Sequence, residues 1–167
     1  MLGRFVAAKR RLVVALAAAS MLAVCVAAAL ATPPLNFVST VLARGTVERN
    51  APTVDAGRAR AETAPDDVAF LNVTVQPGGT SGWHSHPGPE IAVVKSGAAT
   101  LYYADDPTCT PHRYSAGQGY VVQPNRVQTV RNEASEPAEF VVAFVVSPGV
   151  PLRNDAPNPG NCSSRGF

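Results

Sequence analysis

The feature that most constrains this chain is a run of short apolar segments between residues 68 and 147, each closed by Gly, Pro, Asp or Asn. The segments are too short for ordinary helices, and many alternate apolar with polar residues, which is the period of a half-buried strand. Seven or eight such strands at close spacing favour a sandwich or a barrel. The strongest segments are 68–76, 91–95, 98–103, 120–123, 127–131 and 140–147. The sequence therefore predicts an all-β fold.

Two weaker segments precede this run. Residues 37–48 alternate well enough for a first strand, and residues 51–67 suggest an edge strand with Arg58, Arg60 and Glu62 on one face. Fifteen prolines and thirteen glycines support many turns. We therefore expect a linker and N-terminal strands over 32–66, the barrel over 67–147 and a Pro-rich tail over 148–167.

The N-terminus has the pattern of a targeting segment. Four cations, Arg4, Lys9, Arg10 and Arg11, precede an uncharged apolar run over 12–31. Small residues before the 31/32 junction fit a signal peptide cleaved after Ala31. The run is also long enough for an uncleaved N-terminal helix that anchors the chain in the membrane. Both interpretations export the remainder, which is then secreted or periplasmic, or held on the outer side of the cytoplasmic membrane.

Charge and cysteine content narrow the function classes. Without the four N-terminal cations the chain keeps ten basic and twelve acidic side chains, so it lacks the clustered basic excess that a nucleic-acid groove needs. No nucleic-acid partner is expected. If the signal leaves, Cys109 and Cys162 remain, and an even pair outside the cytosol predicts a disulfide. The alternative is two unpaired thiols.

The residues that carry chemistry lie in one glycine-rich stretch over 78–97. His84 and His86 are two positions apart, so both imidazoles project from the same side of an extended backbone. Glu90 returns to that side after a Pro-Gly-Pro turn. Two imidazoles and one carboxylate can bind a divalent metal and leave positions open for water, dioxygen or a substrate. The alternative is that His84 and His86 are merely polar residues on a glycine-rich loop and do not bind a metal.

The spacing of five positions in this stretch resembles the first motif of the cupin family. That motif is glycine, five residues, His-x-His, three or four residues, glutamate, six residues and glycine. It is matched by Gly78, His84, His86, Glu90 and Gly97. The resemblance covers roughly 67–147 and implies a double-stranded β-helix, which is a jelly-roll barrel, with a metal near one mouth. It also implies dimerisation through barrel edges.

The second cupin motif is matched only in part. Gly117, Gln128 and Asn132 have the expected separations, but Pro124 is displaced by one residue and the usual histidine is missing. Its place falls to Gln128, or to Thr129 if the proline sets the register. An amide oxygen is a weaker ligand than an imidazole. The predicted metal ligands are His84, His86, Glu90 and Gln128, for iron, manganese, nickel or zinc, and the alternative is a site that has lost its metal.

Three functional hypotheses follow, and the first two involve a small-molecule ligand or substrate. The first is a dioxygenase-like or other small-molecule metalloenzyme. The second is a non-catalytic ligand-binding or sensing module. The third is an envelope structural domain tethered through residues 12–31, in which a barrel edge recruits a partner. Further candidates are Trp83 and Tyr120, as pocket lining or packing, and His112, as a fifth ligand, a proton shuttle or a solvated turn residue.

Overall fold

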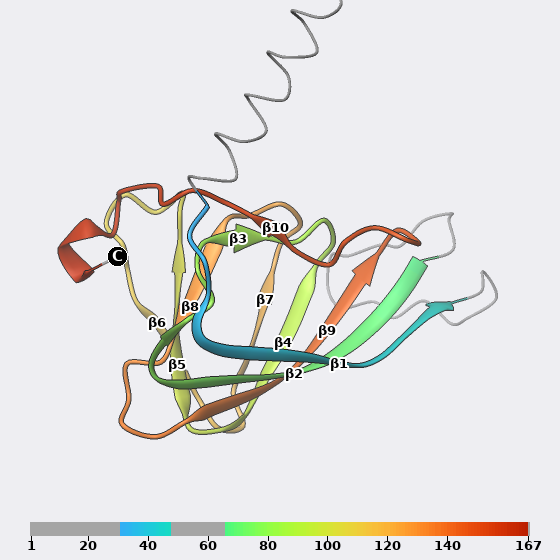
Figure 1. Ribbon diagram of the computed structural model, residues 1–167, viewed down its shortest axis with the longest axis horizontal. Coiled ribbons are helices and arrows are strands. Elements are labelled where there is room, and N and C mark those ends of the chain that lie inside the picture. The colour runs from blue at the N-terminus through green and yellow to red at the C-terminus, as the bar shows by residue number, and fades with distance from the viewer. Residues whose placement is uncertain (1–30, 48–65, 167) are drawn as a thin grey trace, which may run out of the picture. The chain divides into compact units, whose positions relative to one another are not determined.

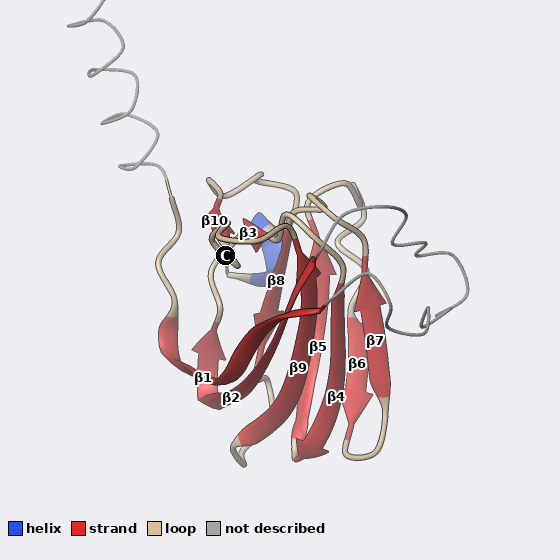
Figure 2. Cartoon of the chain, turned by 90° about the vertical axis from the view of Figure 1, so that its right-hand side faces the viewer, coloured by secondary structure: helices blue, strands red, loops and turns tan. Residues whose placement is uncertain are grey.

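The structure is a computed structural model, and it describes residues 31–47 and 66–166. Ten strands and one short 3-10 helix occupy these ranges (Figures 1 and 2). The strands of the first half are β1 (Leu35–Val47), β2 (Asp66–Thr80), β3 (His84–Ser85), β4 (Glu90–Ser96) and β5 (Ala98–Tyr103). Those of the second half are β6 (His112–Ser115), β7 (Gly119–Val122), β8 (Gln128–Arg131), β9 (Ala138–Val146) and β10 (Asn154–Asp155), followed by η1 (Ser163–Arg165).

All strand pairs are antiparallel, and the strands curl into a nearly closed barrel. One side runs in the order β1-β2-β9-β4-β7, and the other runs β10-β3-β8-β5-β6. The two sides are joined where Thr80 of β2 pairs with Arg131 of β8. The all-β fold predicted from the strand pattern is confirmed, and of the two architectures left open, sandwich and barrel, the chain forms the barrel.

Alternation of side chains places the core inside the barrel. In β9, Phe140, Val142 and Phe144 are buried while Val141 between them is exposed, as expected for a strand with one face inward. Inward residues of β2, β4 and β5 complete this core. Burial of one face explains why the period-2 pattern located these strands correctly.

The strand β2 extends beyond the predicted end at residue 76, through Pro77, Gly78 and Gly79 to Thr80. Gly78 adopts a left-handed φ of 72°, which glycine tolerates without strain. Asn132 then supplies two backbone partners, because its carbonyl accepts from the Gly78 N–H and its own N–H donates to Gly79. The predicted turn is therefore a bend within a continuing strand.

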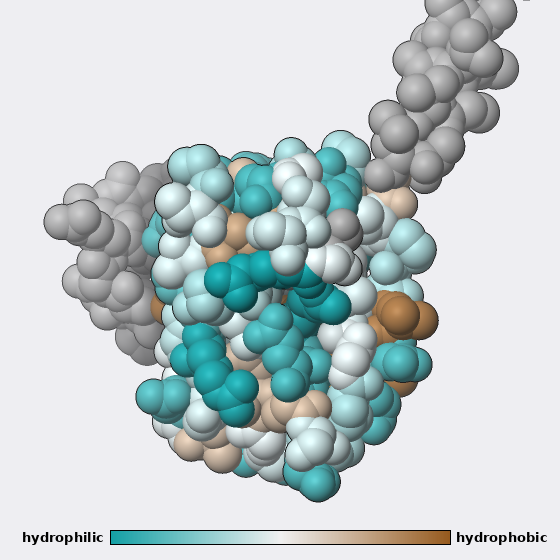
Figure 3. Space-filling model, turned by 90° about the vertical axis from the view of Figure 1, so that its left-hand side faces the viewer, coloured by the Kyte–Doolittle hydropathy of each residue, from teal (hydrophilic) through white to brown (hydrophobic). Residues whose placement is uncertain are grey.

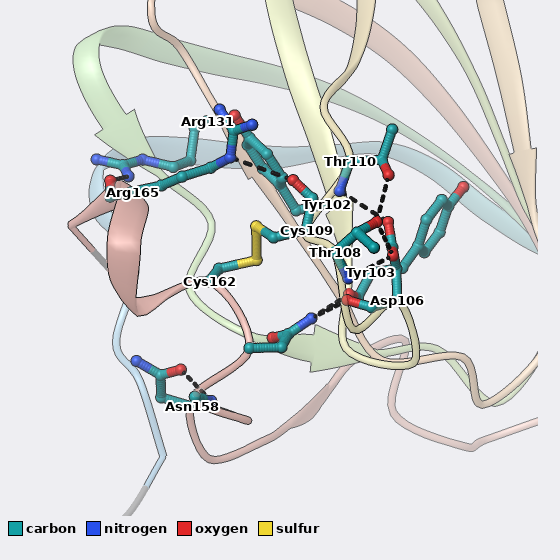
Figure 4. Close-up of a disulfide and its surroundings, with 12 residues drawn as sticks. Tyr102, Tyr103, Asp106, Thr108, Cys109, Thr110, Arg131, Asn158, Cys162 and Arg165 are labelled. Carbon is teal, nitrogen blue, oxygen red and sulfur yellow. Dashed lines mark hydrogen bonds between the residues drawn. A yellow bond between two sulfur atoms is a disulfide. The ribbon is translucent and has the colours of Figure 1, made fainter.

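The segment expected as a tail packs against the barrel. Strand β10 pairs with β3, and Ala156 and Cys162 join Trp83, Tyr102 and Cys109 in a second apolar cluster. The sulfur atoms of Cys109 and Cys162 are bonded in the structure, with their Cα atoms 5.3 Å apart (Figure 4). That a disulfide forms in the compartment where the protein works stays a prediction.

The side of the molecule that carries η1 is largely hydrophilic, with apolar atoms gathered at one edge and smaller apolar areas between the polar ones (Figure 3). Within 31–47 and 66–166 no helix has the length and hydropathy that a bilayer crossing requires. Nearly all of the predicted signal or anchor segment lies outside the described residues, and so does most of the predicted edge strand over 51–67.

Candidate metal centre

Strand pairing and one side-chain hydrogen bond bring three of the four predicted ligands together. His84 opens β3 and pairs with Gln128, the first residue of β8. Glu90 opens β4, and a hydrogen bond from Gln128 Nε2 to Glu90 Oε2 connects the two sides of the barrel. His86 follows β3, and its ring centroid lies 4.8 Å from that of His84. All four side chains are buried.

Backbone carbonyls orient both imidazoles in the same way. His84 Nδ1 lies 2.9 Å from the Gly82 carbonyl oxygen, and His86 Nδ1 lies 2.6 Å from that of Leu152. A carbonyl oxygen only accepts, so each Nδ1 carries a proton, and a ring that is neutral then has its lone pair on Nε2. This is the arrangement in which proteins present histidine to a metal, with the second nitrogen held by a hydrogen bond.

The Glu90 carboxylate collects three contacts. Its Oε2 accepts from Gln128, its Oε1 lies 3.4 Å from the Tyr120 hydroxyl, and Oε2 is 3.2 Å from His86 Nε2. The last pair makes no hydrogen bond. In a neutral ring protonated on Nδ1, the Nε2 lone pair faces a carboxylate oxygen, and a cation between these two acceptors, either a proton or a metal ion, would stabilise the pair.

Burial sets the protonation of two groups in this site. Desolvation, followed by the positive charge of Arg153, holds the pKa of the His84 imidazole well below its usual 6.5. His84 is therefore neutral at physiological pH, as a metal ligand must be. Desolvation, with the negative charge of Glu90 second, raises the pKa of Tyr120 well above 10. Tyr120 therefore stays protonated, and its hydroxyl donates a hydrogen bond toward Glu90.

The donor atoms in this site are of the types that bind a divalent metal, although their arrangement is not that of a formed metal site. Two buried atoms that suit a metal, His86 Nε2 and Gln128 Oε1, have no hydrogen-bond partner. Within the described ranges, however, no three His, Cys, Asp or Glu side chains are already arranged to hold an ion. The Glu90 carboxylate is turned toward the Gln128 amide, and ligation requires it to exchange that contact.

At the second motif, the structure brings the side chain of Gln128, and not that of Thr129, to Glu90. Thr129 points the other way, where its hydroxyl lies 3.1 Å from that of Thr80. Asn125 stands where the motif has its glycine, and it adopts a left-handed φ of 59° that asparagine accepts more readily than most residues. The side-chain contacts therefore favour Gln128 over Thr129 as the candidate ligand.

A cavity of about 90 Å³ opens beside these residues, with room for several waters or a small organic molecule. It is lined by His84, His86, Glu90 and Tyr120, but also by residues that the sequence analysis did not propose. These are Phe37 and Ser39 of β1, Ser81, and Leu152 and Arg153 of the predicted tail. No local motif marks them, because they reach the cavity only through long-range packing.

Two weaker candidates lie elsewhere. Trp83 is buried in the second apolar cluster, so the packing interpretation holds for it. His112 lies on β6 and sets its ring edge-on to Tyr103, with centroids 5.4 Å apart. Neither residue lines the cavity. Tyr120 does line it, which agrees with the pocket interpretation.

Comparison with known proteins agrees with this geometry. Residues 71–144 match the family model of the cupin domain. Among solved structures, an uncharacterized conserved protein with a double-stranded β-helix domain from Klebsiella pneumoniae is 20% identical, covering 75% of this chain and 86% of its own, with a TM-score of 0.50. This likeness confirms the predicted fold, a double-stranded β-helix.

Two further solved structures have TM-scores below 0.5. The polyketide cyclase RemF from Streptomyces resistomycificus is 12% identical, covering 72% of this chain and 77% of its own, with a TM-score of 0.49. A Bacillus subtilis oxalate decarboxylase with Mn(II) centres is 24% identical, covering 57% and 29%, with a TM-score of 0.46. No curated protein matches the sequence.

Proposed function

We propose that the chain, whose residues 71–144 match the family model of the cupin domain, binds a divalent metal through His84, His86 and Glu90, with Gln128 as a weaker fourth ligand. Iron, manganese, nickel and zinc all suit two imidazoles and a carboxylate. The observation that carries the proposal is the shared orientation of the histidines, each with Nδ1 on a backbone carbonyl, which in a neutral ring leaves the Nε2 lone pair for a metal.

The activity that this site supports best is small-molecule metalloenzyme chemistry of the dioxygenase-like class. A bound metal would supply Lewis acidity and open coordination positions for a substrate oxygen. The chain's own residues do the rest: apolar walls exclude water, Tyr120 donates toward Glu90, and the carboxylate is placed to hold a proton beside the cavity.

A non-catalytic ligand-binding or sensing module is the second candidate. It is favoured by one observation, the hydrogen bond from the Gln128 amide to the Glu90 carboxylate, which occupies an oxygen that a metal would need. In that case the cavity binds a small molecule without turnover. Metal content separates the two candidates.

The decisive experiment measures metal by plasma mass spectrometry on protein purified without chelators. We expect near-stoichiometric iron, manganese, nickel or zinc in the wild type, and its loss in the double variant His84→Ala/His86→Ala. His112→Ala is the matched control, because that histidine lies outside the cavity. A wild type that is empty and refuses added metal contradicts the proposal and favours the binding module.

We also propose that the chain is exported through residues 1–31, which act as a cleaved signal peptide or as a membrane anchor. The support is the sequence pattern of four cations followed by an apolar run. Sequencing the N-terminus of the mature protein tests it. A start at Thr32 supports cleavage, an intact N-terminus in the membrane fraction supports the anchored envelope domain, and an intact protein in the cytosol contradicts export.

A further inference from the structure

The cavity has an amphiphilic lining that describes its ligand. Most of the wall consists of apolar side chains from both sides of the barrel, while the polar groups lie at the candidate metal centre and beside it. The apolar residues are Phe37, Leu71, Val73, Val130, Phe140, Val142, Phe144 and Leu152. A ligand that fills this space has a small apolar body and one strongly polar end.

Arg153 is the one lysine or arginine among the described residues that line the cavity. Its guanidinium is anchored at two points, since Nη2 donates to the Ser81 carbonyl at 2.7 Å and Nε donates to Asp155 Oδ1 at 2.6 Å. A guanidinium has five N–H donors. The remaining donors have no acceptor in the described part of the chain, and the Asp155 side chain that balances the charge is 54% exposed.

The backbone on both sides of Arg153 is connected to the candidate metal centre. The preceding residue, Leu152, accepts the hydrogen bond from His86 Nδ1 through its carbonyl. Two residues further on, Asp155 pairs with His84 in the β10–β3 ladder. Arg153 therefore lies on a segment that is tied to both histidines, and its position in the cavity is set by the same contacts that orient them.

We propose that Arg153 binds the carboxylate of a small monocarboxylic acid whose apolar body occupies the cavity. The planar guanidinium matches a carboxylate in a charge-assisted, two-point contact, and the apolar walls strengthen that contact by excluding water. A single arginine beside a cavity of this small volume suits a ligand that carries one carboxylate. The inference deepens the proposed function and rests on it, because the same cavity borders the metal centre.

The test is calorimetric titration of the full chain with straight-chain monocarboxylates of two to six carbons, each paired with its neutral amide. We expect at least one acid to bind at least tenfold more tightly than its amide. Arg153→Gln then weakens acid binding at least tenfold and leaves amide binding unchanged, whereas Arg153→Lys loses less. Arg113→Gln, on the exposed side of β6, is the matched control and binds as the wild type does.

Several outcomes overturn the inference: no acid binds, acid and amide bind equally, Arg153→Gln binds the acid as tightly as the wild type, or inorganic phosphate binds as well as the acids. The melting temperature and metal affinity of Arg153→Gln show that the fold and the metal centre are intact. If Arg153-dependent acid binding persists in a protein that takes up no metal, the metal proposal fails and this inference stands. If metal binds normally and Arg153→Gln has no effect, only this inference fails.

Discussion

At the scale of single residues, the candidate site is decided by what holds each side chain rather than by the motif alone. The motif put His84, His86 and Glu90 on one side of the chain. The carbonyls of Gly82 and Leu152 then select the proton position on each imidazole. Gln128 takes the place of the usual histidine, and its amide reaches the same carboxylate.

The substitution Gln128→His should increase metal affinity. An imidazole is a stronger ligand than an amide oxygen for iron, nickel or zinc, and we expect about a tenfold gain, which corresponds to about 1.4 kcal/mol. Competition titration with a chromophoric chelator measures it. Gln123→His, at an exposed position, is the control and should leave the affinity unchanged. An unchanged or reduced affinity for Gln128→His would mean that Gln128 does not border the metal.

The metal-free protein should lose stability as the pH falls below about 6.5. The pKa of His84 is lowered by burial in the folded chain, whereas the unfolded chain takes up a proton near the ordinary value. Unfolding therefore binds protons in this range, and acid favours it. Melting temperatures between pH 7.5 and pH 5.5 measure the effect, which should be smaller in His84→Gln. Equal pH dependence in both proteins would count against a neutral buried His84.

At the scale of elements, turns decide where strands begin and end. Gly97 connects β4 to β5 with a left-handed φ of 70°, and a Cβ there would lie 2.3 Å from the Pro137 carbonyl oxygen. Gly117 also has a left-handed φ, of 82°, yet a Cβ there would meet nothing within 4 Å. The two glycines separate conformational strain from steric crowding.

We expect Gly97→Ala to cost about 3 kcal/mol of unfolding free energy, and Gly117→Ala about 1 kcal/mol. Both alanines are strained by the left-handed conformation, but only the alanine at position 97 also collides with neighbouring backbone atoms. Urea denaturation of the two variants and the wild type provides the comparison. Equal losses would show that the neighbouring strand moves aside at little cost, and that crowding does not explain Gly97.

At the scale of the whole molecule, the C-terminal segment completes what the barrel begins. It adds β10 to β3, places Leu152 and Arg153 in the cavity wall and packs Ala156 and Cys162 on Trp83. Around the Cys109–Cys162 pair, Arg165 donates to the Cys109 carbonyl at 3.1 Å. The segment is therefore part of the domain, although it lies outside residues 71–144.

If the Cys109–Cys162 disulfide forms, it closes a loop with a sequence separation of 53 residues. Loop entropy then assigns it about 4 kcal/mol of unfolding free energy. We expect Cys109→Ser/Cys162→Ser to lower the denaturation midpoint accordingly under non-reducing conditions. A reductant should lower the wild-type midpoint to the same value and leave the variant unchanged. A wild type insensitive to reductant, with two thiols reactive after unfolding, would establish the unpaired alternative.

Sequence alone determined the all-β class, the positions of the main strands and three ligand candidates, because these depend on local quantities. Alternation shows which strand face is buried, and the spacing of His84 and His86 puts both on one side. The short strands β3, β6 and β10 were not predicted: β3 and β10 have only two residues, too few to carry a period, and β6 is polar at three of its four positions.

Only the tertiary structure decided the second-motif register, the continuation of β2 through Gly78 and the role of residues 152 and 153. Each depends on a partner far away in the chain: Glu90 for Gln128, Asn132 for Gly78, and His86 for the Leu152 carbonyl. A backbone carbonyl has no side-chain signature, and a lone arginine in a Pro-rich segment resembles any solvated cation. The fold brings both to the cavity.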